Sequence, residues 1–349
     1  MRRLAKSLVF HSSRVTGIER AVSASNWRRQ RVLILGYHGV SLDDEHVWDP
    51  ALFMNPRTLR RRFEILRETQ CTVLSLSEAL TRLRDGTLPE RAVVLTFDDG
   101  LFDFRVHVAP MAAEFGYPVT VYLSTYYSVY QSPVFPVMLS YLLWKARGRR
   151  LSMGTVGVPD VEVTAENHAS MLAAFGRHVA QARLHATDKA KLLEEVAAAL
   201  SIDYAEILRK RILQLMTPEE VASLDQRWVS VELHTHRHRT PTDRPSFEDE
   251  IVRNREIITA ATGRNPTHLC YPSGRFETRG FEWLRALGVE SAVTCQPGLA
   301  AKSDEMFALP RFIDTEPTSQ SAFRAWVSGV AQLLPRRKVD HTPEDSNHG

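Results

Sequence analysis

AVVLTFDDG, residues 92–100, is a short run of apolar residues that ends abruptly in two carboxylates and a glycine. A continuous apolar run of this length, bounded by turn residues, is typical of a strand that is buried on both faces of a parallel sheet. Two further segments have the same character, RVLILGYHGV (31–40) and VTVYLST (119–125), and helical spacing fills the chain between them. This alternation of buried strands with helices predicts a parallel α/β fold.

The alternation is interrupted once and then resumes. Residues 130–225 have mainly helical patterns, and we interpret about 130–215 as a helical insertion into the α/β core. Strand-like segments return at 228–236, 267–274 and 290–295, with helical spacing between them. Residues 336–349 are charged and contain proline, and they are expected to form a disordered tail.

The composition is that of an ordinary globular protein. The 349 residues are 44% hydrophobic and 24% charged, which is enough apolar material for a large core. A net charge of +3 gives no support for nucleic-acid binding. Three cysteines without a CxxC pair argue against a disulfide framework and against a cysteine zinc site. Because the pattern shows neither a secretory signal nor a run of about 20 apolar residues, we expect a cytoplasmic body.

The positive charge is concentrated in a basic N-terminal arm, residues 1–30. Seven Lys and Arg side chains there oppose one acidic residue, so the arm is +6 and the other 319 residues together are −3. Such an arm predicts peripheral contact with an anionic membrane on the inner surface, where Leu4, Leu8 and Val9 would enter the interface if the arm were helical. A solvated tail, or a helix packed on the body, is the alternative.

Asp98 and Asp99 follow directly on the apolar run 92–97. Two adjacent carboxylates at the end of a buried strand cost free energy unless a ligand or a reaction uses them. In parallel barrels the active site lies at this end of the strands. One carboxylate could bind a cation while the other acts as a base; a plain Asp-Asp-Gly turn is the alternative.

A histidine cluster follows another strand-like segment, in VELHTHRHRTP (231–241). If the strand continued, its period of two would place His234, His236 and His238 on one face. Imidazole is a common ligand of Zn²⁺ and similar ions. Two histidines and one carboxylate leave an open position for water or substrate, which is the layout of a catalytic metal site. A surface cluster of polar histidines is the alternative.

Taken together, these motifs resemble those of the polysaccharide deacetylase family (carbohydrate esterase family 4, the NodB-homology domain). TFDDG (96–100) and the later His-Thr-x-x-His (234–238) are complete and in the family's order. YHGV (37–40) and CYPSG (270–274) resemble two further family motifs. The resemblance covers roughly residues 31–315, with the insertion inside it, so we expect the deacetylase barrel to occupy residues 31–335.

The resemblance implies a distorted (β/α)7 TIM-like barrel. It also implies that Asp98 is the catalytic base and that a divalent metal ion, expected to be Zn²⁺, is bound by Asp99, His234 and His238. The backbone N–H of Ser273 would help to hold the oxyanion. The implied activity is the removal of N-acetyl groups from a glycan that contains amino sugars, either a polysaccharide or a lipid-linked saccharide.

The chain departs from the family's pattern at two places. The arginine that pairs with the base in other members is replaced by Cys270, and Arg311 in the apolar segment LPRF is our candidate to take its place. An ordinary structural ion pair is the alternative for Arg311. The late Leu-His motif that supplies the general acid is missing, and His38 and His236 are the candidates to replace it.

Two other functions fit the same motifs. One is an amino-sugar deformylase on the same barrel, which would act on a sugar attached to a lipid carrier. The other is a catalytically impaired pseudoenzyme that binds a glycan, since the late motif is missing. Comparing acetyl with formyl substrates would distinguish the deformylase from a deacetylase. Bound metal together with hydrolysis would distinguish an enzyme from the pseudoenzyme.

Overall fold

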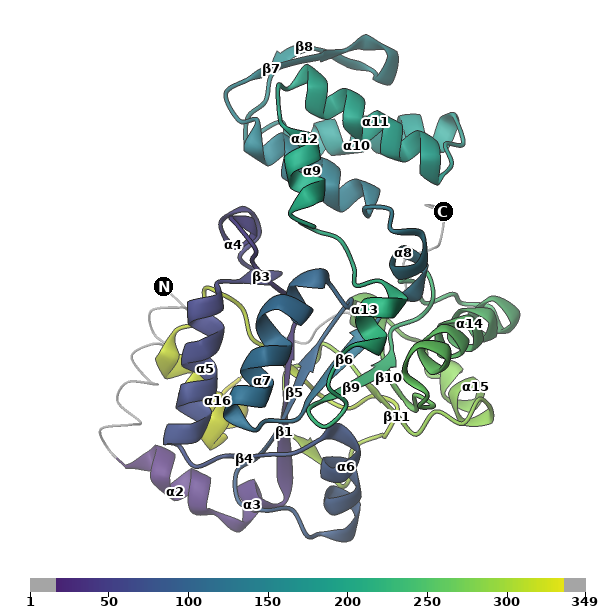
Figure 1. Ribbon diagram of the computed structural model, residues 1–349. Helices are drawn as coiled ribbons and strands as arrows, with labels where there is room; N and C mark the ends of the chain where they lie inside the picture. The colour runs from purple at the N-terminus through teal and green to yellow at the C-terminus, as the bar shows by residue number, and fades with distance from the viewer. Residues whose placement is uncertain (1–16, 336–349) are drawn as a thin grey trace.

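The computed structural model describes residues 17–335 (Figure 1). Six parallel strands form a curled sheet in the order β11-β10-β9-β6-β5-β1. Their bounds are β1 Arg31–Tyr37, β5 Ala92–Phe97, β6 Val119–Leu123, β9 Val229–Leu233, β10 His268–Cys270 and β11 Ser291–Val293. The predicted α/β fold, a distorted (β/α)7 TIM-like barrel, is confirmed.

The segment 309–313 closes the barrel. Leu309 forms a parallel bridge with Val293 of β11, and β13 (Phe312–Ile313) pairs in parallel with β1. Arg311 lies between these two contacts, and its side chain is fully buried. The closure therefore places one cationic side chain inside the barrel.

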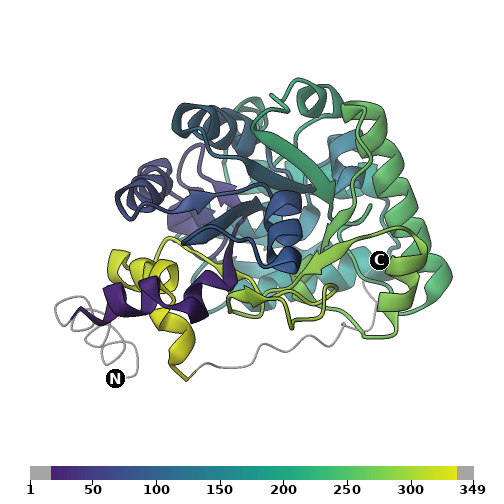
Figure 2. The ribbon, with the colours of Figure 1, turned by 90° about the horizontal axis from the view of Figure 1, so that it is seen from below.

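Helices surround the strands, as the view along the barrel shows (Figure 2). The helices α5, α6, α7, α13, α14, α15 and α16 span Pro56–Glu68, Leu76–Asp85, Ala109–Phe115, Pro218–Ala222, Arg244–Thr262, Gly280–Ala286 and Gln320–Ser328. Short elements connect them: β2 Gly39–Val40, α4 Glu45–Trp48, β3 Phe53–Met54, β4 Thr72–Val73, η1 Phe104–Val108, η3 Pro272–Gly274, β12 Ala300–Ala301 and η4 Val330–Leu333. Local sequence explains several ends; Asn55, for example, caps α5 and Pro56 occupies its first position.

The described part of the basic arm packs on the barrel. Its helices α2 (Ile18–Ala24) and α3 (Asn26–Arg29) lie beside α16 and the start of β1. The Arg28 guanidinium is fully buried and donates to the backbone oxygens of Val327, Arg31 and Ala92. Residues 17–30 are thus part of the folded body, whereas residues 1–16 and the expected tail 336–349 lie outside the described residues.

The insertion stands over the end of the barrel that carries α4 and α8 (Figure 1). α8 Thr125–Tyr130 leads from β6 into the insertion, whose elements are α9 Phe135–Lys145, β7 Arg150–Met153, η2 Gly154–Val156, β8 Val158–Glu162, α10 His168–Gln181, α11 Ala186–Ala199 and α12 Tyr204–Arg209. The insertion is mainly helical, as expected, but β7 and β8 add an antiparallel hairpin. Most of its buried apolar side chains form a core separate from that of the barrel. The chain then returns beside the barrel, where the amide of Phe102 donates to the oxygen of Gln214.

Within residues 17–335, no helix combines the length and the apolar character that crossing a membrane requires.

Candidate active site

Asp98 and Asp99 lie where β5 ends, at the end of the barrel that faces the insertion. The amide of Asp98 still donates to the oxygen of Tyr37 on β1, at 2.8 Å, so this residue continues the sheet. Asp99 has a left-handed backbone (φ 69°), which turns the chain away from the sheet. Gly100 permits this turn, because a Cβ there would lie 2.3 Å from the Leu123 side chain. As a result Asp98 is buried inside the barrel, and Asp99 is partly exposed.

Asp99, His234 and His238 converge on one point. The Nε2 atoms of His234 and His238 both lie 3.2 Å from Oδ1 of Asp99. His234 uses its Nδ1 to contact the backbone oxygen of Cys270, at 2.8 Å. Because Nδ1–H donates to that oxygen, the Nε2 lone pair is free to bind a cation. The ligand atoms of the three residues lie within 4.8 Å of one another, and the set of donors fits a divalent ion.

The same contacts control the ionisation of Asp99. Burial by itself would raise the pKa of this carboxyl group, but the hydrogen bonds from His234 and His238 hold its pKa well below the ordinary value. Asp99 is therefore an anion at neutral pH, as a metal ligand must be.

His236 does not join this set, so the expectation that a period of two would align all three histidines is wrong. β9 ends at Leu233, and Thr235 adopts a left-handed backbone (φ 62°) that breaks the alternation. The Nδ1 of His236 instead lies 2.9 Å from Oγ1 of Thr125, and its ring packs against Tyr126. Of the two candidate general acids, His236 therefore contacts Thr125 and Tyr126 and does not join Asp99.

Arg311 binds Asp98 through both of its terminal nitrogens, at 2.6 Å to Oδ1 and 2.7 Å to Oδ2. The predicted pairing of these two residues is confirmed. The guanidinium also donates to Oγ1 of Thr96 and to the oxygen of Thr294. Burial would raise the pKa of Asp98, but the Arg311 charge and its hydrogen bonds lower it, so Asp98 is ionised.

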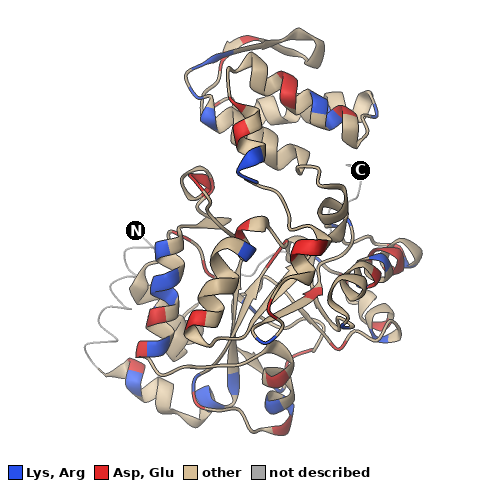
Figure 3. Ribbon diagram, in the orientation of Figure 1, with Lys and Arg blue, Asp and Glu red and all other residues tan. Residues whose placement is uncertain are grey.

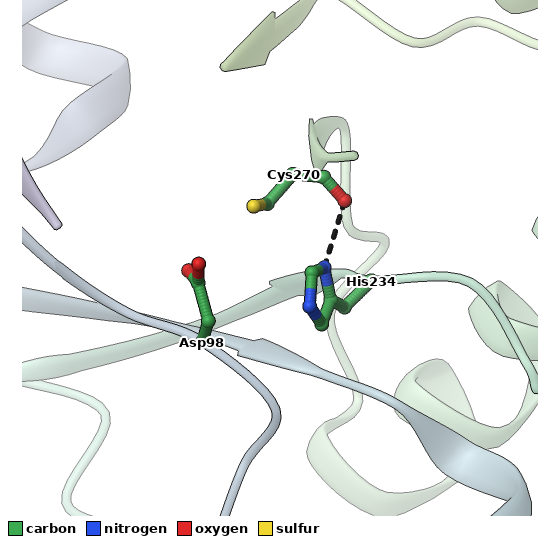
Figure 4. Close-up of side chains that lie close together, drawn as sticks. All are labelled: Asp98, His234 and Cys270. Carbon is green, nitrogen blue, oxygen red and sulfur yellow. Dashed lines mark hydrogen bonds between the residues drawn. The ribbon is translucent and has the colours of Figure 1, made fainter. Parts of the chain in front are cut away.

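Cys270 lies beside this ion pair. Figure 4 shows its sulfur directed toward Asp98 and its carbonyl oxygen bonded to His234. The Cys270 Sγ is 3.2 Å from a terminal nitrogen of Arg311. Asp98, His234 and Cys270 also come close enough to suggest a second cation site. Since Arg311 already contacts both Asp98 and Cys270, its positive charge disfavours a metal ion there.

His38 also reaches Asp98. Its Nε2 is 3.7 Å from Oδ2 of Asp98, and its side chain is 20% exposed. Of the two candidate general acids, only His38 lies next to Asp98, the candidate base. Ser273, the candidate for the oxyanion, sits in η3 directly after β10, with an exposed side chain and a left-handed backbone (φ 56°). Its role stays a prediction.

Asn254 is a contributor that the sequence reasoning missed. This buried side chain of α14 accepts from the amide of His234 at 2.9 Å and donates to the oxygen of Leu123 at 2.8 Å. It thereby ties β9 to β6 where the site is built. The available signal was an Asn at helical spacing from Ile251 and Ile258, on the apolar face of α14.

Along the described helices and strands, Lys and Arg are interspersed with Asp and Glu in the view of Figure 3.

Comparison with known proteins gives a consistent result. The family model described as polysaccharide deacetylase matches residues 160–292, a stretch that includes His234 and His238 but starts after Asp98 and Asp99. The chain is 27% identical over 120 residues to the putative polysaccharide deacetylase YxkH of Bacillus subtilis, covering 33% of this chain and 42% of that protein. It is 23% identical over 323 residues to the poly-beta-1,6-N-acetyl-D-glucosamine N-deacetylase of Escherichia coli, covering 91% of this chain and 42% of that protein. The chain thus spans less than half the length of both relatives.

Among solved structures, the chain resembles IcaB from Ammonifex degensii. The TM-score is 0.55 at 16% sequence identity, and the match covers 85% of this chain and 97% of that one. At this level of identity the likeness concerns the fold.

Proposed function

We propose that this chain, which matches the polysaccharide deacetylase family model over residues 160–292, is a member of that family and hydrolyses N-acetyl groups on a glycan that contains amino sugars. The observation that carries the proposal is the placement of two sets of side chains next to each other. Asp99, His234 and His238 form a ligand set for a divalent ion, and Asp98, held by Arg311, lies beside it.

The chemistry divides among these side chains. A divalent ion on Asp99, His234 and His238, with Zn²⁺ as the expected ion, would supply an acidified water and polarise the acetyl carbonyl. Asp98 takes the proton of the attacking water, and Arg311 keeps this carboxylate ionised and oriented. The backbone N–H of Ser273 donates to the oxyanion that forms on the acetyl carbonyl.

His38 completes the reaction. As the C–N bond breaks, its Nε2 donates a proton to the departing sugar amine, which would otherwise be a poor leaving group. The products are acetate and a free amino sugar. We assign this role to His38 rather than to His236 because the imidazole of His38 is the one that lies next to Asp98.

For the substrate class we propose polymers of N-acetylglucosamine. The support is the Escherichia coli relative, which aligns with 91% of the chain and is named for poly-beta-1,6-N-acetyl-D-glucosamine. Lipid-linked saccharides and a formyl substrate are the alternatives. Release of acetate or formate from matched N-acetyl and N-formyl β-1,6-glucosamine oligomers tests this choice. Faster release of formate would favour the deformylase, and metal-independent glycan binding without release of either would favour the pseudoenzyme.

For the location we propose peripheral contact with an anionic membrane on the cytoplasmic side. Arg28 is buried, so it cannot contribute to this attraction; Arg20 and Arg29 remain on the described surface. Arg2, Arg3, Lys6 and Arg14 lie outside the described residues. Sedimentation with anionic vesicles at low salt is the test, comparing the full chain with a chain that starts at Gly17 and keeps the folded helices. Equal sedimentation of the two chains would leave residues 1–16 without a membrane role.

A further inference from the structure

Hydrogen bonds do little to hold the imidazole of His38 in place. Its Nε2 is 3.7 Å from Asp98, longer than an ordinary hydrogen bond, and its buried Nδ1 has no partner among residues 17–335. The position of the ring is therefore set by the backbone that carries it and by the side chains packed around that backbone.

That backbone is clamped by a short pair of strands. β2, which directly follows His38, pairs with β3, and the amide of Gly39 donates to the oxygen of Leu52 at 3.0 Å. The ring of Phe53 lies so close to Gly39 that a Cβ there would be 2.2 Å from its Cε1 atom. A displacement of Phe53 would thus move the residue next to His38.

Residues 41–52, which connect β2 with β3 and which we name the His38 loop, are held by the insertion. The hydroxyl of Tyr141 on α9 donates to Oδ1 of Asp44 at 2.5 Å, and the ammonium of Lys145 donates to Oδ2 at 2.7 Å. At a second point, Lys210 donates to Asp43 at 2.7 Å. Burial would raise the pKa of Asp44, but the bonds from Lys145 and Tyr141 lower it, so this contact involves an anion.

An aromatic chain continues from this contact toward the active site. The rings of Trp48 and Tyr141 form a T-shaped pair with their centroids 5.3 Å apart, and the centroids of Trp48 and Phe53 are 5.8 Å apart. Phe53 in turn packs on Gly39. Tyr141 is fully buried in the insertion core, so packing holds its side chain in place at the insertion end of these contacts.

We propose that Tyr141 and Lys145 of the insertion are positioning residues for His38, acting through Asp44, Trp48 and Phe53. This inference rests on the proposed function and adds a role for the insertion within it. Displacing a reacting group by about 1 Å can cost about 100-fold in rate, so contacts remote from the chemistry can matter for proton donation.

The test uses the dependence on the leaving group. A sugar amine must be protonated as it leaves, whereas the aryl oxide of an aryl acetate leaves without a proton. In the Zn²⁺-loaded full chain, Tyr141→Phe should lower kcat on N-acetylated β-1,6-glucosamine oligomers by about 10-fold or more, and change aryl acetate hydrolysis by less than about twofold. His38→Gln should show the same selective loss. If Tyr141 acts through His38, the double variant should lose little more than His38→Gln alone.

Tyr204→Phe is the matched control, because it removes a hydroxyl from the same insertion, on α12, without touching Asp44. Tyr204→Phe should leave the rates of hydrolysis of both substrates unchanged. Equal losses on both substrates in Tyr141→Phe, or additive losses in the double variant, would overturn the positioning role. An unaltered chain that hydrolyses aryl acetate but no N-acetyl group would instead count against the proposed function itself.

Discussion

The guanidinium of Arg311 donates to both carboxylate oxygens of Asp98, at 2.6 and 2.7 Å, although the two residues are 213 positions apart in the chain. Both side chains are buried, and such pairs stabilise a fold only when their remaining hydrogen bonds are satisfied. Here Thr96 and Thr294 supply them. Because Arg311 lies in the segment that closes the barrel, the placement of Asp98, the proposed base, and the closure of the fold depend on the same residue.

Arg311→Met should lower both stability and activity. The Asp98 carboxylate would remain buried without a partner, which typically costs about 3–5 kcal/mol of unfolding free energy. Its pKa would rise, since the main cause that lowers it is the Arg311 charge. Urea unfolding and acetate release measure the two effects.

A second buried pair provides the control for this variant. Arg62 and Asp314 are 2.8 Å apart and equally buried, but they lack a contact with Asp98. Arg62→Met should therefore destabilise the fold while the activity per folded molecule persists. If the two variants lose the same activity per folded molecule, Arg311 is only a structural residue.

Asp98→Asn should keep the metal and lose about 10²–10⁴-fold in kcat, which is the usual contribution of a general base. The ligand set on Asp99 is unchanged in this variant, whereas Asp99→Asn should lose metal and activity together. Elemental analysis and acetate release on the same samples separate the two carboxylates. Near-normal turnover of Asp98→Asn would assign the base to another residue.

His234→Gln and His238→Gln should each release the metal. His236→Gln is the matched control, because His236 has the same chemistry and lies between them but contacts Thr125 instead of Asp99. Elemental analysis after gel filtration should show metal in the control alone. Full metal content in both ligand variants would rule out this site.

His268 should make the stability depend on pH. Burial lowers its pKa to about 4, from an ordinary 6.5. Between pH 4 and 6.5 the unfolded chain therefore binds more protons than the folded chain, and stability falls as the pH falls through this window. The unaltered chain should lose on the order of 3 kcal/mol of unfolding free energy from His268 as the pH falls from 6.5 to 4. His268→Gln should lack this loss, as measured by urea unfolding.

The neighbouring Glu232 provides a control of opposite sign. Burial raises its pKa to about 7, so its contribution to stability falls as the pH rises from about 4.5 to 7. Glu232→Gln should reduce that loss. Parallel stability curves for His268→Gln and the unaltered chain would contradict the buried, uncharged state of His268.

Much of the site could be predicted from the sequence because its parts are local. Asp98 and Asp99 follow an apolar run, and His234 and His238 follow another; ends of parallel strands meet at one edge. Arg311 could be selected because a charge in an apolar segment needs a buried partner. Its pairing with Asp98 followed from the family resemblance, and the barrel closure supplies the geometry.

The rest depends on tertiary structure that no local pattern records. The left-handed turn at Thr235 sends His236 away from the site, although the alternation of histidines favours the opposite. From the sequence, Arg28 counts as one of the charges of the basic arm. In the structure its guanidinium is buried and donates to three backbone oxygens. The contact between Asp44 and Tyr141 joins residues that are 97 apart, and it forms only when the insertion folds over the barrel.

Deacetylation by this chain can be measured directly by mass spectrometry of an N-acetylated β-1,6-glucosamine oligomer after incubation with the Zn²⁺-loaded full chain. We predict products lighter by one acetyl group per modified sugar, with acetate released in equal amount. Asp98→Asn, loaded with the same ion, should leave the oligomer almost unchanged. An unmodified oligomer in both samples, with metal bound at Asp99, His234 and His238, would contradict the assignment of this site to deacetylation of such glycans.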